Sequence, residues 1–214
     1  MPLIHHRPPA AMQHALLAGL PDFTNSSDPA AGDLFKANQG QEVYVLSLKG
    51  IKSGAGLRAK QDAGWRFVSA ATPGGVGAAA HVSNDAHGTP VMRGISHGPE
   101  IAAAVRAARE VESLPEVAAQ QFDMWVLRIP AVLVEAYWLK SSSGNKELIV
   151  PYHAGTTKLQ LMKAYSVKEF LKIVGVLAHE FSAFDRTATT RDSPRKKQSN
   201  AAKKKAPKKG DSNT

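Results

Sequence analysis

The chain has 214 residues, of which 43% are hydrophobic, and it contains no cysteine. This length and composition suit one ordinary domain with flanking segments, and the lack of cysteine excludes disulfides, thiolate metal sites and a cysteine nucleophile. The net charge of +9 is unevenly distributed, because residues 186–214 hold 10 Lys and Arg against 2 Asp and leave 17 basic and 16 acidic groups in residues 1–185. The basic character therefore belongs to the C-terminal tail.

No apolar stretch of the chain approaches the ~20 residues that a membrane-spanning helix needs. The apolar segment near the N-terminus, Ala15–Leu20, follows His14 and precedes Pro21, which does not fit a secretory signal. We therefore expect a cytoplasmic protein with no membrane partner.

Residues 1–40 show little regular patterning. Pro8–Leu20 is compatible with a short helix that places Met12 and Leu16 on one face, and turn-forming residues follow it. We expect this N-terminal segment to be poorly ordered or loosely docked.

Short segments rich in alternating or β-branched apolar residues predict a sheet in the next part of the chain. The predicted strands are Glu42–Lys49, Trp65–Ala71, Gly77–Val82 and Val91–Ser96. A polar, Gly-rich connection over residues 50–64 separates the first two strands, and turn residues separate the others. Because these connections are short, they favour antiparallel pairing.

Two helices are predicted. The first covers about residues 99–113, because Pro99 suits the first helical position and Glu100 suits the N-terminal dipole. The second covers residues 167–182 and opens with a capping box between Ser166 and Glu169. Each has an apolar face that we expect to lie on the sheet.

The longest apolar stretch is Phe122–Pro151, and we expect it at the centre of the core. Residues 125–129 alternate as a strand that ends at Pro130, and Glu147–Val150 returns as a strand after a Ser-rich and Gly-containing turn. Between them, Val132–Leu139 favours a strand over the alternative of a short helix beginning at Pro130.

These elements predict one α+β domain over residues 41–184, with an antiparallel or mixed sheet of six to seven strands covered by two main helices. Leu159–Met162 is a candidate edge strand, and an exposed sheet edge allows a homodimer or another protein partner. Residues 185–214 lack aromatic and branched aliphatic side chains, so a disordered basic tail is predicted.

No catalytic or metal motif stands out. Gly75–Ala80 matches the short form of a dinucleotide-binding fingerprint, but no adequate helix follows it, so a Gly-rich turn is the better interpretation. The histidines lack metal-binding spacing, and Ser96 and His97, as neighbours on a strand, point to opposite faces. We therefore expect no cofactor, no metal and no set of catalytic residues, which favours a non-enzymatic role.

Polar side chains beside the core are the remaining candidates for a pocket. Glu135 lies inside the apolar stretch, either as a solvent-facing carboxylate or as a buried acid whose pKa is raised. The candidate pocket residues are Arg128, Glu135, Tyr137 and His153. They support one alternative for the function, which is a small enzyme or ligand-binding domain with a pocket between sheet and helices and a tail that is only a solubiliser.

The tail interleaves Lys with Ala, Pro and Ser, and its composition resembles the tails of linker histones and of some bacterial nucleoid proteins. Such a tail binds polyanions by releasing counterions, without reading sequence. The expected polyanion-binding residues are Arg195, Lys196, Lys197, Lys203, Lys204, Lys205, Lys208 and Lys209. The favoured function is therefore a soluble binding or adaptor module whose tail associates non-specifically with nucleic acid or another polyanion.

Overall fold

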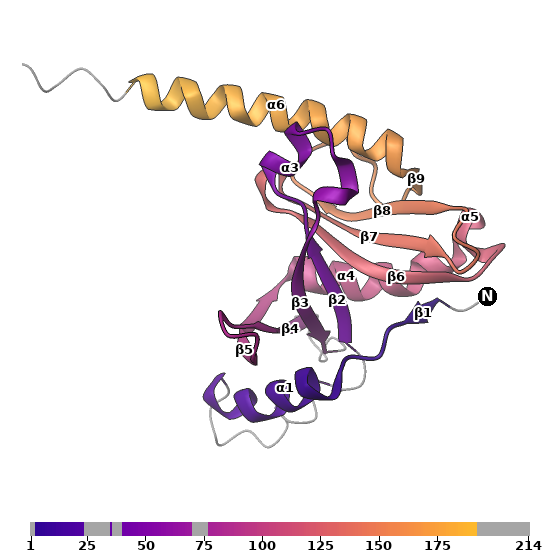
Figure 1. Cartoon of the computed structure of the whole chain (residues 1–214). Coiled ribbons are helices and arrows are strands. Elements are labelled where there is room, and N and C mark those ends of the chain that lie inside the picture. Colours follow the sequence, from indigo (N-terminus) through magenta and orange to yellow (C-terminus); the bar gives the residue numbers. More distant parts are fainter. Residues whose placement is uncertain (1–2, 24–34, 36–39, 70–76, 192–214) are drawn as a thin grey trace, which may run out of the picture.

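The computed structural model describes residues 3–23, 35, 40–69 and 77–191, and Figure 1 shows their arrangement. The strands are β1 (Ile4–His5), β2 (Gly40–Val45), β3 (Gln61–Val68), β4 (Gly77–Asn84), β5 (Pro90–Gly98), β6 (Phe122–Ile129), β7 (Val134–Ser141), β8 (Glu147–Ala154) and β9 (Tyr165–Ser166). The α-helices are α1 (Ala10–Phe23), α3 (Leu48–Lys52), α4 (Pro99–Glu110), α5 (Pro115–Ala118) and α6 (Val167–Arg191). Short 3-10 turns are η1 (Gly56–Ala59), η2 (Val111–Ser113) and η3 (Pro130–Val132).

Within the described residues the nine strands form one sheet in the order β5-β4-β3-β2-β6-β7-β8-β9, and β1 pairs with β6. The pairing is antiparallel except that β1 and β2 both run parallel to β6. The predicted α+β class and mixed sheet are therefore confirmed. The prediction of six to seven strands is too low, because β1 and β9 have two residues each and give no periodic signal.

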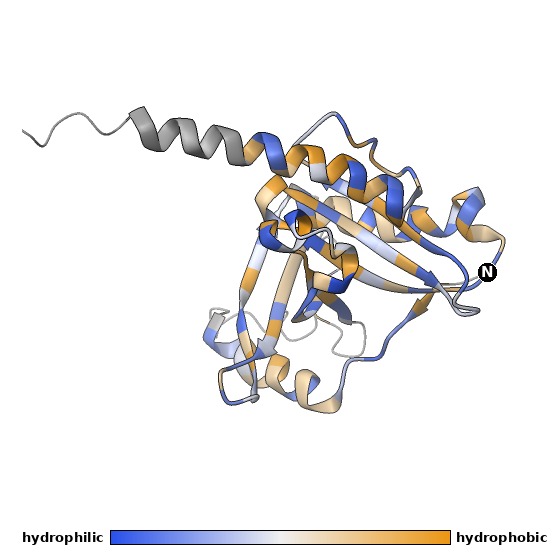
Figure 2. Cartoon of the chain, turned by 45° about the horizontal axis from the view of Figure 1, so that its top comes forward, coloured by the Kyte–Doolittle hydropathy of each residue, from blue (hydrophilic) through white to orange (hydrophobic). Residues whose placement is uncertain are grey.

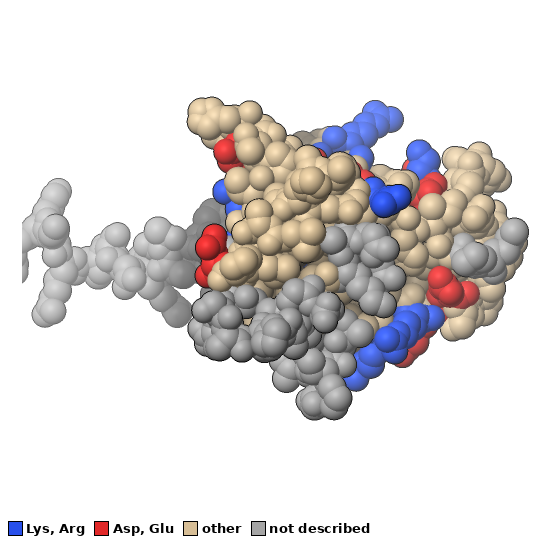
Figure 3. All heavy atoms as spheres, turned by 90° about the horizontal axis from the view of Figure 1, so that it is seen from below, with Lys and Arg blue, Asp and Glu red and all other residues tan. Residues whose placement is uncertain are grey.

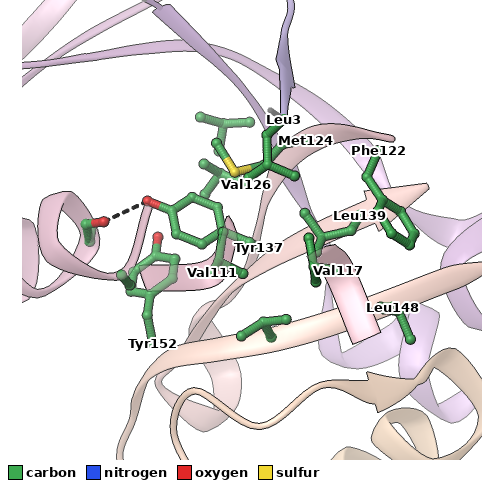
Figure 4. Close-up of a cluster of buried hydrophobic side chains, with 14 residues drawn as sticks. Leu3, Val111, Val117, Phe122, Met124, Val126, Tyr137, Leu139, Leu148 and Tyr152 are labelled. Atoms are coloured by element: carbon green, nitrogen blue, oxygen red, sulfur yellow. Dashed lines mark hydrogen bonds between the residues drawn. The ribbon is translucent and has the colours of Figure 1, made fainter. Parts of the chain in front are cut away.

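Helices cover both faces of the sheet (Figure 1). On one face, α4 and β6–β8 enclose an apolar cluster that includes Val126 and Leu139, drawn in Figure 4. On the other face, Phe170 and Val174 of α6 pack on the same strands, and hydrophobic and hydrophilic residues alternate along this helix in Figure 2. Because successive residues of a strand point to opposite faces, β7 contributes to both layers.

The N-terminal helix is firmly docked. The prediction of a poorly ordered or loosely docked segment is wrong for residues 3–23, since Met12, Leu16 and Leu20 of α1 are buried in a cluster with Trp65 and Phe67 of β3. The apolar face of α1 was predicted, but its partner surface could not be, because the strands that form it lie far along the chain. The described residues therefore hold three long helices, not the two expected.

The first predicted strand ends earlier than its apolar alternation suggests. Ser47 caps α3, because its Oγ accepts a hydrogen bond from the Gly50 amide at 3.1 Å. Strand β2 consequently stops at Val45, and the connection predicted over residues 50–64 contains most of α3, all of η1 and the start of β3.

The stretch Phe122–Pro151 lies at the centre of the sheet, as predicted. Its strands β6 and β7 are separated by η3, in which Leu133 takes a left-handed backbone conformation with φ of 51°. Pro151 does not end β8 but lies within it, at a bulge against β7. The predicted edge strand Leu159–Met162 is wrong, and Tyr165–Ser166 pairs with β8 instead.

The capping box of α6 is confirmed. Glu169 Oε2 accepts a hydrogen bond from the Ser166 amide at 3.0 Å, and Ser166 Oγ accepts one from the Glu169 amide at 3.3 Å. The helix continues to Arg191, so residues 185–191, which composition assigned to the tail, are helical, and the last turns of α6 extend beyond the sheet in Figure 1. Residues 192–214, with all eight expected polyanion-binding residues, lie outside the described residues.

Candidate functional site

Arg66 is the most deeply buried charged residue in the described part of the chain, with 1% of its surface exposed. Its neighbours Trp65 and Phe67 pack under α1, so strand alternation turns the Arg66 side chain to the opposite face of β3. There its Nε and Nη2 donate to Oε1 of Gln41 at 3.3 and 2.9 Å, and its Nη1 donates to Oε2 of Glu135 at 3.2 Å. The guanidinium is thus both charge-paired and hydrogen-bonded.

Glu135 accepts three side-chain hydrogen bonds. Besides Arg66, the donors are Nε of Arg128 at 2.8 Å and the hydroxyl of Tyr152 at 2.9 Å. Burial alone would raise the pKa of Glu135, but the charges of Arg66 and Arg128 and the bonds from Tyr152 and Arg128 hold it below its ordinary value. Both sequence-based alternatives are therefore wrong: the carboxylate does not face solvent, with 14% of its side chain exposed, and its pKa is not raised.

The geometry of this cluster depends on a bulge between β7 and β8. Ala136 pairs with Pro151 and Glu135 pairs with His153, so Tyr152 is the extra residue on β8. Its hydroxyl reaches Glu135 from this bulge. Burial raises the pKa of Tyr152 well above its ordinary value, so the phenol stays protonated and remains a donor.

Tyr137 and His153, two of the four predicted pocket residues, take different positions. Tyr137 is fully buried, and its hydroxyl donates to the Ala104 carbonyl of α4 at 2.7 Å, the dashed line in Figure 4. Its ring lies 4.7 Å from that of Tyr152. His153 is exposed, and although it is the β8 backbone partner of Glu135, no side-chain hydrogen bond among the described residues joins it to the cluster. The structure thus brings Arg128, Glu135 and Tyr137 to one cluster and leaves His153 outside it.

A solvent-open hollow of about 320 Å³ adjoins this cluster. It is lined by His81, Arg93, Gly94, Ile95, Ser96 and Arg128. His81 is the β4 partner of Arg66, so the hollow continues the line of polar residues along the same face of the sheet. Its volume is at the small end of the range for sites that bind small molecules.

His81 is uncharged near neutral pH. Burial, followed by the nearby charges of Arg66 and Arg128, lowers its pKa to about 4, and Glu135 opposes this only in part. Its Nε2 lies 3.3 Å from Oγ of Ser96 on β5. The neutral ring can therefore exchange a hydrogen bond with the hydroxyl without adding charge to the hollow.

Positive charge exceeds negative charge around the hollow. Arg93 and Arg128 line the hollow, no acidic side chain is among its described lining residues, and the nearby Glu135 is already paired with both Arg66 and Arg128. The Arg128 side chain is 39% exposed, and its two terminal NH₂ groups make no hydrogen bond with any other described residue. Its Nε, by contrast, is held by Glu135. The guanidinium is therefore anchored at one edge and open at the other.

Sequence reasoning missed Arg66, Gln41, His81 and Tyr152 as parts of one cluster. It considered only His97 as a partner for Ser96 and rejected that pair, whereas in the structure His97 is exposed and His81 contacts Ser96 across the β4–β5 hairpin. The turn around residues 85–88 carried a usable signal, because folding two strands about it brings the region of residue 81 opposite residues 94–96.

The remaining expectations from the sequence concern the Gly-rich segment Gly75–Ala80, metal binding and membrane spans. The described part of Gly75–Ala80 belongs to strand β4 from Gly77 onward and does not begin a helix. Among the described residues, no group of three or more His, Cys, Asp or Glu side chains is placed to hold a metal ion. No helix in that part of the chain is long and apolar enough to cross a bilayer.

Comparison with known proteins gives no assignment. No protein family matches the chain, and neither a curated protein nor a solved structure is similar to it.

Proposed function

We propose that the domain binds a small anionic ligand in the hollow beside Arg128. The observation that carries this proposal is the open edge of the Arg128 guanidinium in a half-buried site with an excess of positive charge. A guanidinium whose two terminal nitrogens are free favours a carboxylate or a phosphate, because both accept two parallel hydrogen bonds.

The neighbouring side chains support the same kind of ligand. Ser96 supplies a hydroxyl donor, and neutral His81 supplies either a donor or an acceptor, so an anion meets no opposing charge from the ring. Glu135 fixes the orientation of Arg128 before the ligand arrives by accepting a hydrogen bond from its Nε. The buried Arg66 also bonds Glu135 and so offsets the negative charge of that carboxylate. Pre-oriented donors lose less entropy on binding, which increases affinity.

Binding is favoured over catalysis. A serine acts as a nucleophile when a neighbouring base is oriented by a third group and has a pKa near the working pH. The His81 pKa of about 4 makes it a weak base, and its Nδ1 makes no hydrogen bond to a described residue. The Ser96–His81 pair therefore supports ligand recognition better than proton transfer.

A thermal-shift screen of small carboxylates and phosphates against the full-length protein tests this proposal. Arg128→Gln should abolish the shift produced by the best anion, because the two terminal donors are lost or uncharged. Arg106→Gln, which changes an exposed arginine of α4, is the matched control. A screen without a stabilising anion, or a shift that survives in Arg128→Gln, would refute the proposal.

A second function is favoured by the separation of charge in the sequence, where most of the net charge lies in residues 186–214. On the face of the domain in Figure 3, basic and acidic side chains are interspersed among uncharged ones. We propose that the tail associates non-specifically with nucleic acid or another polyanion, which makes the protein an adaptor. Replacing the eight tail cations Arg195, Lys196, Lys197, Lys203, Lys204, Lys205, Lys208 and Lys209 with Gln should abolish salt-sensitive binding to a DNA duplex. Equal binding by both proteins would exclude this role.

A further inference from the structure

A larger hollow, of about 630 Å³, lies on the α6 side of the sheet. Its walls come from the segment between α3 and β3, which includes η1, from β7 and β8, and from the first turns of α6. It opens on the opposite face from the Arg128 cluster, because Trp138 lines it and the preceding residue Tyr137 packs under α4. It is therefore a separate site that does not depend on the proposed function.

Trp138 has an unsatisfied hydrogen-bond donor. The residue is 7% exposed, and its Nε1 is buried with no hydrogen-bond partner among the described residues. The neighbouring Trp125, in contrast, donates from Nε1 to Oε2 of Glu42 at 3.0 Å. A buried N–H without an acceptor destabilises a fold, so an acceptor that reached this N–H from the adjoining hollow would stabilise the protein.

More basic than acidic side chains line this hollow. Lys60 lies over the ring of Trp138, with its Nζ 4.8 Å from the centroid, and neither Lys60 nor Arg58 forms an ion pair with a described carboxylate. Lys140 pairs at 4.0 Å with Glu147, the acidic side chain among the described lining residues. Three cations against one carboxylate leave two positive charges for a ligand to balance.

We propose that this hollow binds a phosphomonoester with an apolar or aromatic body. A phosphomonoester dianion matches the two excess positive charges, and its terminal oxygens can accept hydrogen bonds from the Lys60 ammonium and the Arg58 guanidinium. Leu57, Val167 and Leu171 form the apolar part of the wall, against which the organic body of the ligand packs.

The test uses ¹⁵N-labelled full-length protein and phenyl phosphate. The protein has three tryptophans, so it gives three indole N–H signals, and Trp138→Phe identifies the one that belongs to Trp138. Phenyl phosphate should move that signal in a saturable way, because Trp138 lines the hollow. Phenol, which lacks the phosphate, should leave the signal in place, and inorganic phosphate should move it with lower affinity because it lacks the apolar body.

Two substitutions make the test specific. Lys60→Met keeps an unbranched apolar side chain over the Trp138 ring but removes the positive charge. Arg58→Gln changes an exposed side chain, so it provides a second test if Lys60→Met does not fold. Each should weaken phenyl phosphate binding by about tenfold or more. Lys52→Met, an exposed lysine that does not line the hollow, is the control and should leave affinity unchanged.

Three results would overturn the proposal. The first is a Trp138 signal that phenyl phosphate does not move at millimolar concentration, and the second is unchanged affinity in Arg58→Gln. The third is a response to phenol as strong as the response to phenyl phosphate, which would make the hollow an apolar site and not an anion site.

Discussion

Arg66 and Glu135 lie 69 residues apart in the sequence, and their side chains form an ion pair of 3.2 Å inside the domain. Arg66 belongs to β3 and Glu135 to β7, and strands β2 and β6 lie between them. On a flat sheet three strand spacings amount to about 14 Å, which two side chains do not easily bridge. The sheet must therefore curve so that its two halves approach on the α4 side, and the ion pair connects those halves.

Replacing Glu135 with Leu should destabilise the protein by about 3–5 kcal/mol, because it leaves the buried Arg66 charge without its carboxylate. Urea unfolding followed by tryptophan fluorescence measures this loss. The double variant Arg66→Met with Glu135→Leu should be more stable than Glu135→Leu alone, since no unpaired charge remains. A single variant that loses under about 1 kcal/mol would contradict the account of a buried, charge-paired Arg66.

The folded state should lose stability as the pH falls from about 6.5 to 4, because the His81 pKa is lowered to about 4 from its ordinary value of 6.5. In this range the unfolded chain binds a proton at His81 and the folded protein does not, so acid favours unfolding. With allowance for partial solvent exposure of the ring, the loss should be about 2 kcal/mol.

Urea unfolding of the wild type and of His81→Gln at several pH values checks this expectation. The groups that act on His81 are Arg66 and Arg128, which lower its pKa, and Glu135, which raises it. His81→Gln should show a shallower acid dependence, and His97→Gln, which changes an exposed histidine of β5, is the control. Equal acid dependence in the wild type and His81→Gln would show that His81 is not held neutral.

Gly64→Ala should destabilise the protein by about 3 kcal/mol or more. Gly64 has a φ of 88°, and a Cβ there would lie 2.1 Å from the carbonyl oxygen of Val82 on the neighbouring strand. Gly88→Ala is a matched control, because Gly88 has a φ of 81° but nothing within 4 Å of an added Cβ, so it should cost about 1–2 kcal/mol. Thermal unfolding of the two variants should rank them in this order, and the reverse order would contradict the close approach of β3 and β4.

Tyr137→Phe should lower stability by about 1 kcal/mol. The substitution removes the hydrogen bond to the Ala104 carbonyl but keeps the ring in the α4 cluster. Urea unfolding measures the difference, and hydrogen exchange should show faster opening of α4. An unchanged unfolding free energy would mean that the hydroxyl does not tie the helix to the sheet.

The elements that the sequence predicted well are those with strong local signals. The capping box of Ser166 and Glu169, the Pro99 helix and the apolar stretch from Phe122 to Pro151 all depend on residues a few positions apart. Local signals also caused errors: apolar alternation extended β2 too far, because it carried no information about the cap at Ser47. Tail composition likewise did not reveal that α6 continues to Arg191.

The candidate site could be predicted only in part, because it depends on long-range pairing. Arg128 and Glu135 were selected only as polar side chains beside the apolar core, and the structure pairs them directly across β6 and β7. Arg66 could not be identified from the sequence, since its strand approaches Glu135 only because the whole sheet curves. Tyr152 reaches the cluster from a bulge, and a period-two pattern cannot locate a bulge.

The most direct test of the proposed function is an isothermal titration of the best-stabilising anion into the wild type and Arg128→Gln. The account predicts measurable binding to the wild type and an affinity at least about tenfold lower in Arg128→Gln, because a charged pair of donors is lost. Ser96→Ala should weaken binding less, since it removes one neutral donor. Equal affinities in the wild type and Arg128→Gln would contradict the assignment of the anion to the hollow beside Arg128.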